Sequence, residues 1–181
     1  GQIIQSDTDT RLYRSLVLEN RSQVLLISDP DADQAAAAMD VAVGQFNDPP
    51  DRQGLAHFLE HMLFLGTDKF PDAGSYGEYL STHGGYSNAF TGLEDTNYVF
   101  SIHKDYLEGA LERFSQFFIS PRFDAKFAKR EVNAVNSEHQ KNINSDQRRI
   151  YQVLRNTANP EHPFNMFGTG NLESLKGGAS I

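Results

Sequence analysis

The chain has 181 residues, 39% of them hydrophobic, and this length and composition predict one domain with a core of its own. Its 16 lysine and arginine residues against 24 aspartate and glutamate residues give a net charge of −8. This charge argues against nucleic acid as a partner, because phosphate binding needs a basic face. The absence of cysteine excludes disulfide scaffolds, thiolate metal sites and cysteine nucleophiles.

No run of about 18 apolar residues is present, so we expect no membrane-spanning segment and a soluble protein. The first six residues lack the basic start and apolar stretch of a signal peptide. The chain does not start with methionine, which indicates processing or trimming. A periplasmic and a cytoplasmic location both stay open.

The first part of the chain predicts strands. Apolar runs at residues 16–18 and 24–27 enclose a short polar stretch, which is typical of a β-hairpin. Residues 35–46 alternate apolar and polar positions, which predicts a third strand. The segment 48–51, Asp-Pro-Pro-Asp, then breaks regular structure.

Residues 54–66 predict a helix that ends at Gly66, with Asp51 as its N-cap. Its apolar side chains surround it almost completely, so we expect it to be buried. They are Leu55, Phe58, Leu59, Met62, Leu63 and Leu65.

The second part of the chain mixes two strands with four helices. Ser75 and Glu78 have the spacing of a capping box for a short helix that ends at residues 84–85. Strands are predicted at 86–91 and 96–102, and helices at 107–118, 124–142 and 146–158; the last helix has an apolar stripe of Ile150, Val153 and Leu154. Without a strict βαβ rhythm, this order favours an α+β fold with an antiparallel sheet covered by helices.

The predicted buried helix carries His57-x-x-Glu60-His61, the inverted H-x-x-E-H motif of inverzincins. Positions i and i+4 share one helix face, so both imidazoles can bind one zinc ion. Glu60 lies offset from this pair, which suits a carboxylate that acts on water rather than on the metal. The alternative, two ordinary core histidines, is disfavoured because burying three such groups unpaired is costly.

A third zinc ligand is needed, and without cysteine the candidates are histidine, aspartate or glutamate. Glu131 and Glu138 lie two turns apart, close to one face of the predicted helix 124–142. Their spacing does not choose between them. A solvated charged face, with Lys129, Arg130 and Lys141, is the competing interpretation.

Four segments together resemble the pitrilysin/insulin-degrading enzyme (insulinase) family of zinc metalloendopeptidases. They are GLAHFLEHM at 54–62, GYSNAFT at 85–91, EVNAVNSEH at 131–139 and HPFNMFGTGN at 162–171. The resemblance extends from about residue 11 to residue 175. It implies a metallopeptidase domain of the pitrilysin and mitochondrial processing peptidase type, and it is closer to the insulysin-like large peptidases.

The resemblance also implies roles for individual residues. One zinc ion per domain would be held by His57, His61 and Glu138, with Glu60 as the general base in peptide-bond hydrolysis. Glu131 would be a supporting acidic residue near the zinc. Peptide substrates would bind along a strand formed by Asn88, Ala89, Phe90 and Thr91.

Relatives of this type are long chains of four homologous domains that close around peptides. The resemblance therefore implies that residues 1–181 are an N-terminal catalytic domain, truncated at its C-terminus, whose partners are the missing C-terminal domains of the same polypeptide. Two alternatives stay open: a zinc- or peptide-binding fragment, and a non-catalytic subunit without turnover. S-ribosylhomocysteine lyase shares the motif, but it needs a cysteine ligand that this chain lacks.

Overall fold

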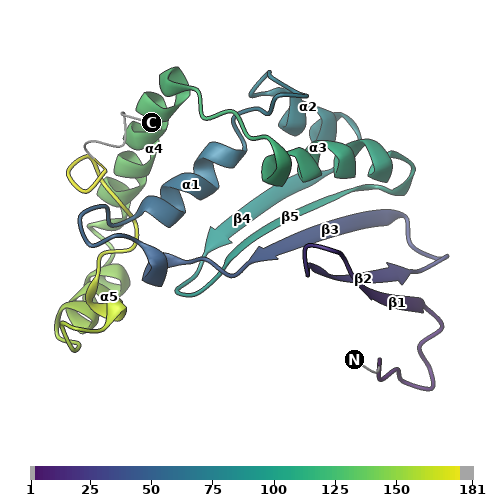
Figure 1. Ribbon diagram of the computed structural model, residues 1–181, viewed down its shortest axis with the longest axis horizontal. Coiled ribbons are helices and arrows are strands. Elements are labelled where there is room, and N and C mark those ends of the chain that lie inside the picture. Colours follow the sequence, from purple (N-terminus) through teal and green to yellow (C-terminus); the bar gives the residue numbers. More distant parts are fainter. Residues whose placement is uncertain (1–2, 176–181) are drawn as a thin grey trace.

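The computed structural model describes residues 3–175 (Figure 1). The end of the chain at 176–181, where the resemblance predicts truncation, lies outside the described residues. The strands are β1 (Leu12–Val17), β2 (Gln23–Ser28), β3 (Gln34–Val41), β4 (Tyr86–Thr91) and β5 (Thr96–His103). The helices are α1 (Leu55–Leu63), α2 (Ser75–Thr82), α3 (Leu107–Ile119), α4 (Ala125–Asn142) and α5 (Asp146–Asn156).

The strands form two antiparallel sheets, which confirms the predicted α+β class. One sheet has the order β3-β5-β4, and the other is the β1-β2 hairpin. Phe100 on β5 lies opposite Ala37 on β3 and Ser87 on β4, and this register places the buried residues of β5 on one face. In the described residues, β4 is therefore an edge strand.

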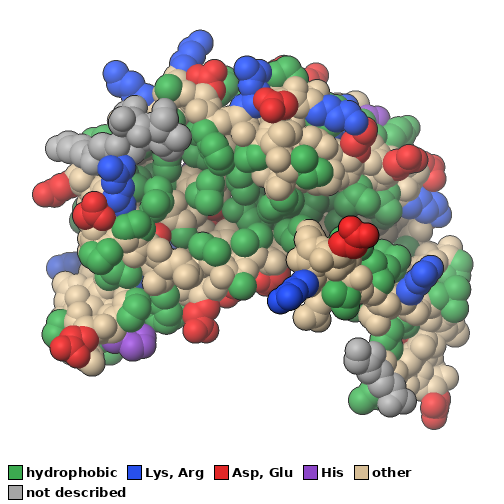
Figure 2. All heavy atoms as spheres, viewed as in Figure 1, with side chains coloured by type: hydrophobic (Ala, Val, Ile, Leu, Met, Phe, Trp, Pro, Cys, Tyr) green, Lys and Arg blue, Asp and Glu red, His purple; other side chains and the backbone are tan. Residues whose placement is uncertain are grey.

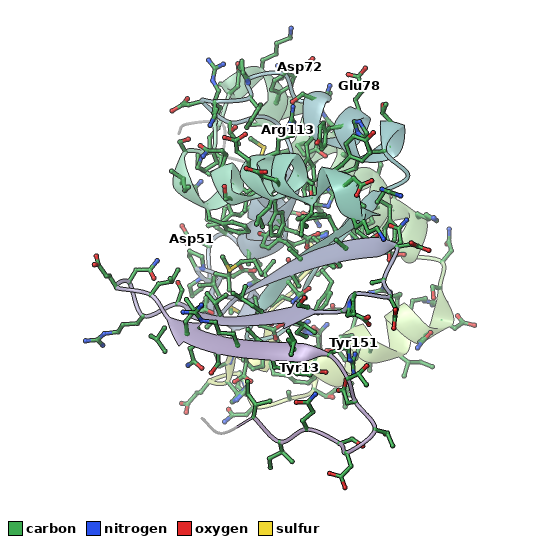
Figure 3. All side chains as sticks on the ribbon, turned by 90° about the vertical axis from the view of Figure 1, so that its right-hand side faces the viewer. Tyr13, Asp51, Asp72, Glu78, Arg113 and Tyr151 are labelled. Atoms are coloured by element: carbon green, nitrogen blue, oxygen red, sulfur yellow. The ribbon has the colours of Figure 1, made fainter. Side chains whose placement is uncertain are left out.

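The main core lies between the three-stranded sheet and helices α2 and α3. Figure 3 shows Glu78 on α2 and Arg113 on α3 above the sheet, with Tyr13 of the hairpin on the opposite side. The fully buried members of this core include Phe100, Leu80, Ile102 and Ala110. Along β4 and β5, every second side chain faces this core, which explains the alternating pattern that predicted strands at 86–91 and 96–102.

A second, smaller core joins α1 to α4. Phe58 and Met62 from α1 pack with Ala128 and Val135 from α4. The prediction that α1 is buried all round is wrong at Leu59, which is 40% exposed, because α4 and β4 cover only the other sides of the helix. This packing places the polar residues of α1 beside α4.

The hairpin and α5 extend on opposite sides of a hollow below the larger sheet (Figures 1 and 2). The apolar stripe predicted on α5 is present, but it faces solvent: Ile150, Val153 and Leu154 are 70%, 61% and 56% exposed. In residues 3–175, no helix is long and apolar enough to cross a membrane.

The strand predicted over 35–46 ends at Val41, so the prediction is wrong for its last part. The chain bends there because it pairs with the turn between β4 and β5. The N–H of Gln45 donates to the carbonyl of Gly92 at 3.0 Å, and the N–H of Phe46 donates to that of Leu93 at 2.8 Å. A side chain at Gly44 would meet this backbone at 2.7 Å, which explains the glycine.

The start of α1 is held by Asp48, and the prediction of Asp51 as its N-cap is wrong. Gly54 is the N-cap residue. The Asp48 carboxylate is buried, and it accepts the N–H groups of Gly54 at 2.7 Å and Ala56 at 2.8 Å. Burial raises the pKa of Asp48, although both hydrogen bonds act in the opposite direction. A residue outside the helix thus satisfies N–H groups that a helix leaves unpaired.

The capping box predicted at the start of α2 is also wrong. Gly74 is the N-cap, and no side chain caps this end. The Ser75 hydroxyl instead donates to the carbonyl of Asp72 at 2.8 Å, in the turn before the helix.

Replacement of Asp48 by alanine should lower the free energy of unfolding by about 1–2 kcal/mol, because two N–H groups at the start of α1 lose their acceptor. Urea denaturation of the chain measures this loss. Asp51→Ala is the matched control and should change stability by less than about 0.5 kcal/mol. Equal losses in the two variants would contradict the role of Asp48.

Candidate metal centre

The two histidines of the motif point from α1 toward α4. Their Nε2 atoms lie 3.3 Å apart, and their rings are nearly perpendicular, at 88°. The positions i and i+4 thus bring both imidazoles to one face of the helix, as the sequence predicts.

Glu138 on α4 completes a group of three. Its Oε2 atom lies 3.5 Å from Nε2 of His57 and 3.8 Å from Nε2 of His61. Two ligands of a tetrahedral ion with bonds of about 2.0–2.1 Å are separated by about 3.3 Å. The donor set and its spacing therefore fit a metal ion such as zinc.

The hydrogen bonds at the opposite ring nitrogens assign the tautomers of both histidines. Nδ1 of His57 donates to the carbonyl of Thr169 at 2.7 Å, and Nδ1 of His61 donates to Oε1 of Glu131 at 3.2 Å. In the neutral rings, both Nε2 atoms then present lone pairs. Together with Oε2 of Glu138, they form a group of three possible metal ligands.

Glu131 and Glu138 contact different atoms of the histidines, although their spacing in the sequence did not show which of them is the candidate ligand. Glu138 reaches both Nε2 atoms, whereas Glu131 contacts the far side of His61. A carboxylate at this position fixes the orientation of a metal-binding imidazole and raises its basicity.

Glu60 lies on the same helix but outside the three-atom group. It is 8% exposed, and its Oε2 accepts a hydrogen bond from the Thr91 hydroxyl at 2.6 Å. Thr91 is the last residue of β4, so this bond ties Glu60 to the edge strand. Burial raises the pKa of nearby Tyr98, and the charge of Glu60 adds to this shift.

The four residues predicted to bind substrate lie on β4. In residues 3–175 this strand pairs only with β5, so its second edge is open. Asn88 and Phe90 are exposed, and Ala89 and Thr91 are partly buried. An open edge offers backbone groups to an extended peptide.

The role of Thr169, whose carbonyl orients His57, was not predicted from the sequence. Two glycines make this contact possible. A Cβ atom at Gly54 would lie 2.2 Å from Gly170, so the backbones of α1 and of the segment after α5 meet too closely for side chains. Both glycines also have positive φ angles, of 93° and 83°. The only hint of this close contact in the sequence was the presence of a glycine in each of the segments GLAHFLEHM and GTGN.

The family is shown by comparison with known proteins. Residues 23–161 match the model of the insulinase family, peptidase family M16. The chain belongs to this family.

Three relatives illustrate the likeness. The chain is 54% identical over 175 residues to the insulin-degrading enzyme of Mus musculus, covering 97% of this chain and 17% of that protein. It is 47% identical over 175 residues to a protein of Schizosaccharomyces pombe whose name includes the words zinc protease. This match covers 97% of the present chain and 18% of that protein. The crystal structure of pitrilysin matches with a TM-score of 0.91 at 44% sequence identity. This match covers 96% of the present chain and 18% of the pitrilysin chain. The chain thus spans less than a fifth of the length of these relatives.

Replacement of Glu131 by alanine should weaken zinc binding about 10–100-fold, because His61 loses the partner that holds its Nδ1 hydrogen. Competition against a chelator of known zinc affinity measures this change. Glu161→Ala, at an exposed position away from both helices, should bind zinc like the wild type. Equal zinc affinity in the wild type, Glu131→Ala and Glu161→Ala would show that Glu131 does not support the site.

Proposed function

We propose that this chain is the catalytic domain of a zinc-dependent metalloendopeptidase that hydrolyses peptide bonds in oligopeptides or small polypeptides. The observation that carries the proposal is the meeting of Nε2 of His57, Nε2 of His61 and Oε2 of Glu138 within 3.8 Å. Membership of peptidase family M16 and the name of the Schizosaccharomyces pombe relative support both zinc and peptidase activity.

His57, His61 and Glu138 would hold the zinc ion, and Glu131 would orient His61. When bound, zinc supplies Lewis acidity, which lowers the pKa of a coordinated water and polarises a carbonyl group. Three protein ligands leave a fourth position open, as catalytic zinc sites require.

Glu60 would act as the general base. It would take a proton from the attacking water and deliver it to the leaving amine. The hydrogen bond from Thr91 holds one carboxylate oxygen, so the other is free for this transfer. The same bond couples the base to the strand on which the substrate would lie.

The peptide would bind as an added strand at the open edge of β4, through Asn88 to Thr91. Main-chain hydrogen bonds give affinity that tolerates many sequences, and side-chain contacts add preference. Because the relatives are several times longer, the proposed enzyme includes further domains of the same polypeptide that close over the peptide.

Glu60→Gln should retain zinc and lose peptide hydrolysis, because an amide cannot accept the proton. Elemental analysis measures the metal, and a fluorogenic peptide measures turnover, in this chain and in the full-length gene product. Glu78→Gln, on the surface of α2, is the matched control with full turnover. Turnover by Glu60→Gln would assign the base elsewhere. Zinc binding without turnover by either wild-type protein would favour the non-catalytic, binding-only alternative.

Proline substitutions along β4 should separate substrate binding from sheet stability. Backbone N–H groups point alternately to the two edges of a strand, so either Asn88 or Ala89 donates outward. Proline at the outward position should weaken the binding of a non-cleaved peptide and keep both stability and zinc. Proline at the other position should destabilise the β4-β5 pair. Unchanged peptide affinity in two correctly folded variants would place the substrate elsewhere.

A further inference from the structure

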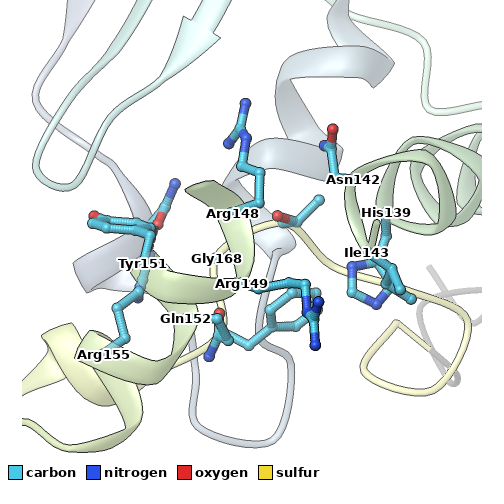
Figure 4. A pocket seen from close by; sticks show the side chains of 12 residues that line it. His139, Asn142, Ile143, Arg148, Arg149, Tyr151, Gln152, Arg155 and Gly168 are labelled. Carbon is cyan, nitrogen blue, oxygen red and sulfur yellow. Dashed lines mark hydrogen bonds between the residues drawn. The ribbon is translucent and has the colours of Figure 1, made fainter. Parts of the chain in front are cut away.

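A cavity of about 280 Å³ lies beside the metal centre, between the end of α4, helix α5 and the segment 167–169 (Figure 4). Its lining includes three arginines of α5: Arg148, Arg149 and Arg155. Arg148 and Arg149 extend from α5 into the space between the two helices. In a chain of net charge −8, this concentration of positive charge is a local exception.

Arg155 is a buried cation with an unused donor. It is 3% exposed; its Nε donates to the carbonyl of Phe164 at 3.0 Å, and its Nη1 donates to Oε1 of Gln45 at 2.6 Å. Its Nη2 is buried and has no hydrogen-bond partner among the described residues. Burial lowers the pKa of Arg155, although Tyr151 and the charge of Asp48 act in the opposite direction.

Few carboxylates of the chain lie close to these arginines, and Asp48 acts on Arg155 without direct contact. Arg149 contacts Asp146 at 3.2 Å, and both side chains are exposed. In residues 3–175, neither Arg148 nor Arg155 forms an ion pair within 4 Å. The cavity therefore provides guanidinium groups, in a partly enclosed space, for an anion from outside the chain.

Two contacts connect the cavity to the metal centre. Thr169 lines the cavity, and its carbonyl holds His57. Asn142, also in the lining, lies one turn after Glu138 on the same face of α4, which is about 6 Å along the helix axis. The cavity therefore borders the metal centre through Thr169 and the last turns of α4, behind His57 as seen from its Nε2 atom.

We propose that this cavity is a specificity subsite that accepts an acidic side chain, glutamate or aspartate, close to the cleaved bond of a peptide substrate. The inference rests on the proposed function and adds the substrate class. A carboxylate accepts paired hydrogen bonds from a guanidinium, a geometry that neutral amides do not match. Free phosphate has related chemistry, so the test must separate a small anion from a peptide side chain.

The test measures the affinity of peptides for the metal-free chain, which cannot turn them over. One glutamate is moved along an otherwise uncharged peptide, and each peptide is paired with one that has glutamine at the same position. We expect one position at which glutamate binds about tenfold more tightly than glutamine, the effect of one charge-assisted contact. The double variant Arg148→Gln/Arg149→Gln should reduce this ratio to about one. Arg14→Gln, on exposed β1, is the matched control and should keep the ratio.

The second arm adds inorganic phosphate. It should weaken the binding of the glutamate peptide and leave that of the glutamine peptide unchanged. Equal binding of both peptides at every position, or a glutamate preference that survives in the double variant, would overturn the subsite. Phosphate binding that depends on the arginines, without any glutamate preference, would instead show a small-anion site. Absence of hydrolysis with zinc added would contradict the proposed function alone, because the affinity ratio does not depend on turnover.

Discussion

The mutual approach of three lone-pair donors is the constraint on which this structure depends. Nε2 of His57, Nε2 of His61 and Oε2 of Glu138 lie 3.3–3.8 Å apart, and each imidazole forms a hydrogen bond through Nδ1 on its opposite side. The packing of α1 on α4 fixes how closely these three side chains approach one another.

Long-range contacts supply that support. Phe58 and Met62 join α1 to α4 through apolar packing, and Asp48 satisfies the N–H groups at the start of α1. Thr169 and Glu131 orient one histidine each, from segments far apart in the sequence. Each of the two histidines thus has a partner at Nδ1, which fixes the orientation of its Nε2 atom.

Local patterns predicted much of this molecule. The alternation at 86–91 and 96–102 gave correct strands because one sheet face is buried, and the i, i+4 spacing placed His57 and His61 together. Features set by distant residues were not predictable: Asp48 caps α1 from outside the helix, and β3 ends early where the chain meets the β4-β5 turn. The carbonyl of Thr169 has no side-chain signature, and the choice of Glu138 over Glu131 needed the family resemblance.

Anomalous diffraction at the zinc absorption edge, from crystals of the chain grown with zinc, shows directly which side chains bind the ion. We expect one strong peak, about 2.0–2.2 Å from Nε2 of His57, Nε2 of His61 and a carboxylate oxygen of Glu138, with Glu131 still bonded to Nδ1 of His61. No peak at this position, or a peak coordinated by Glu131 in place of Glu138, would contradict it.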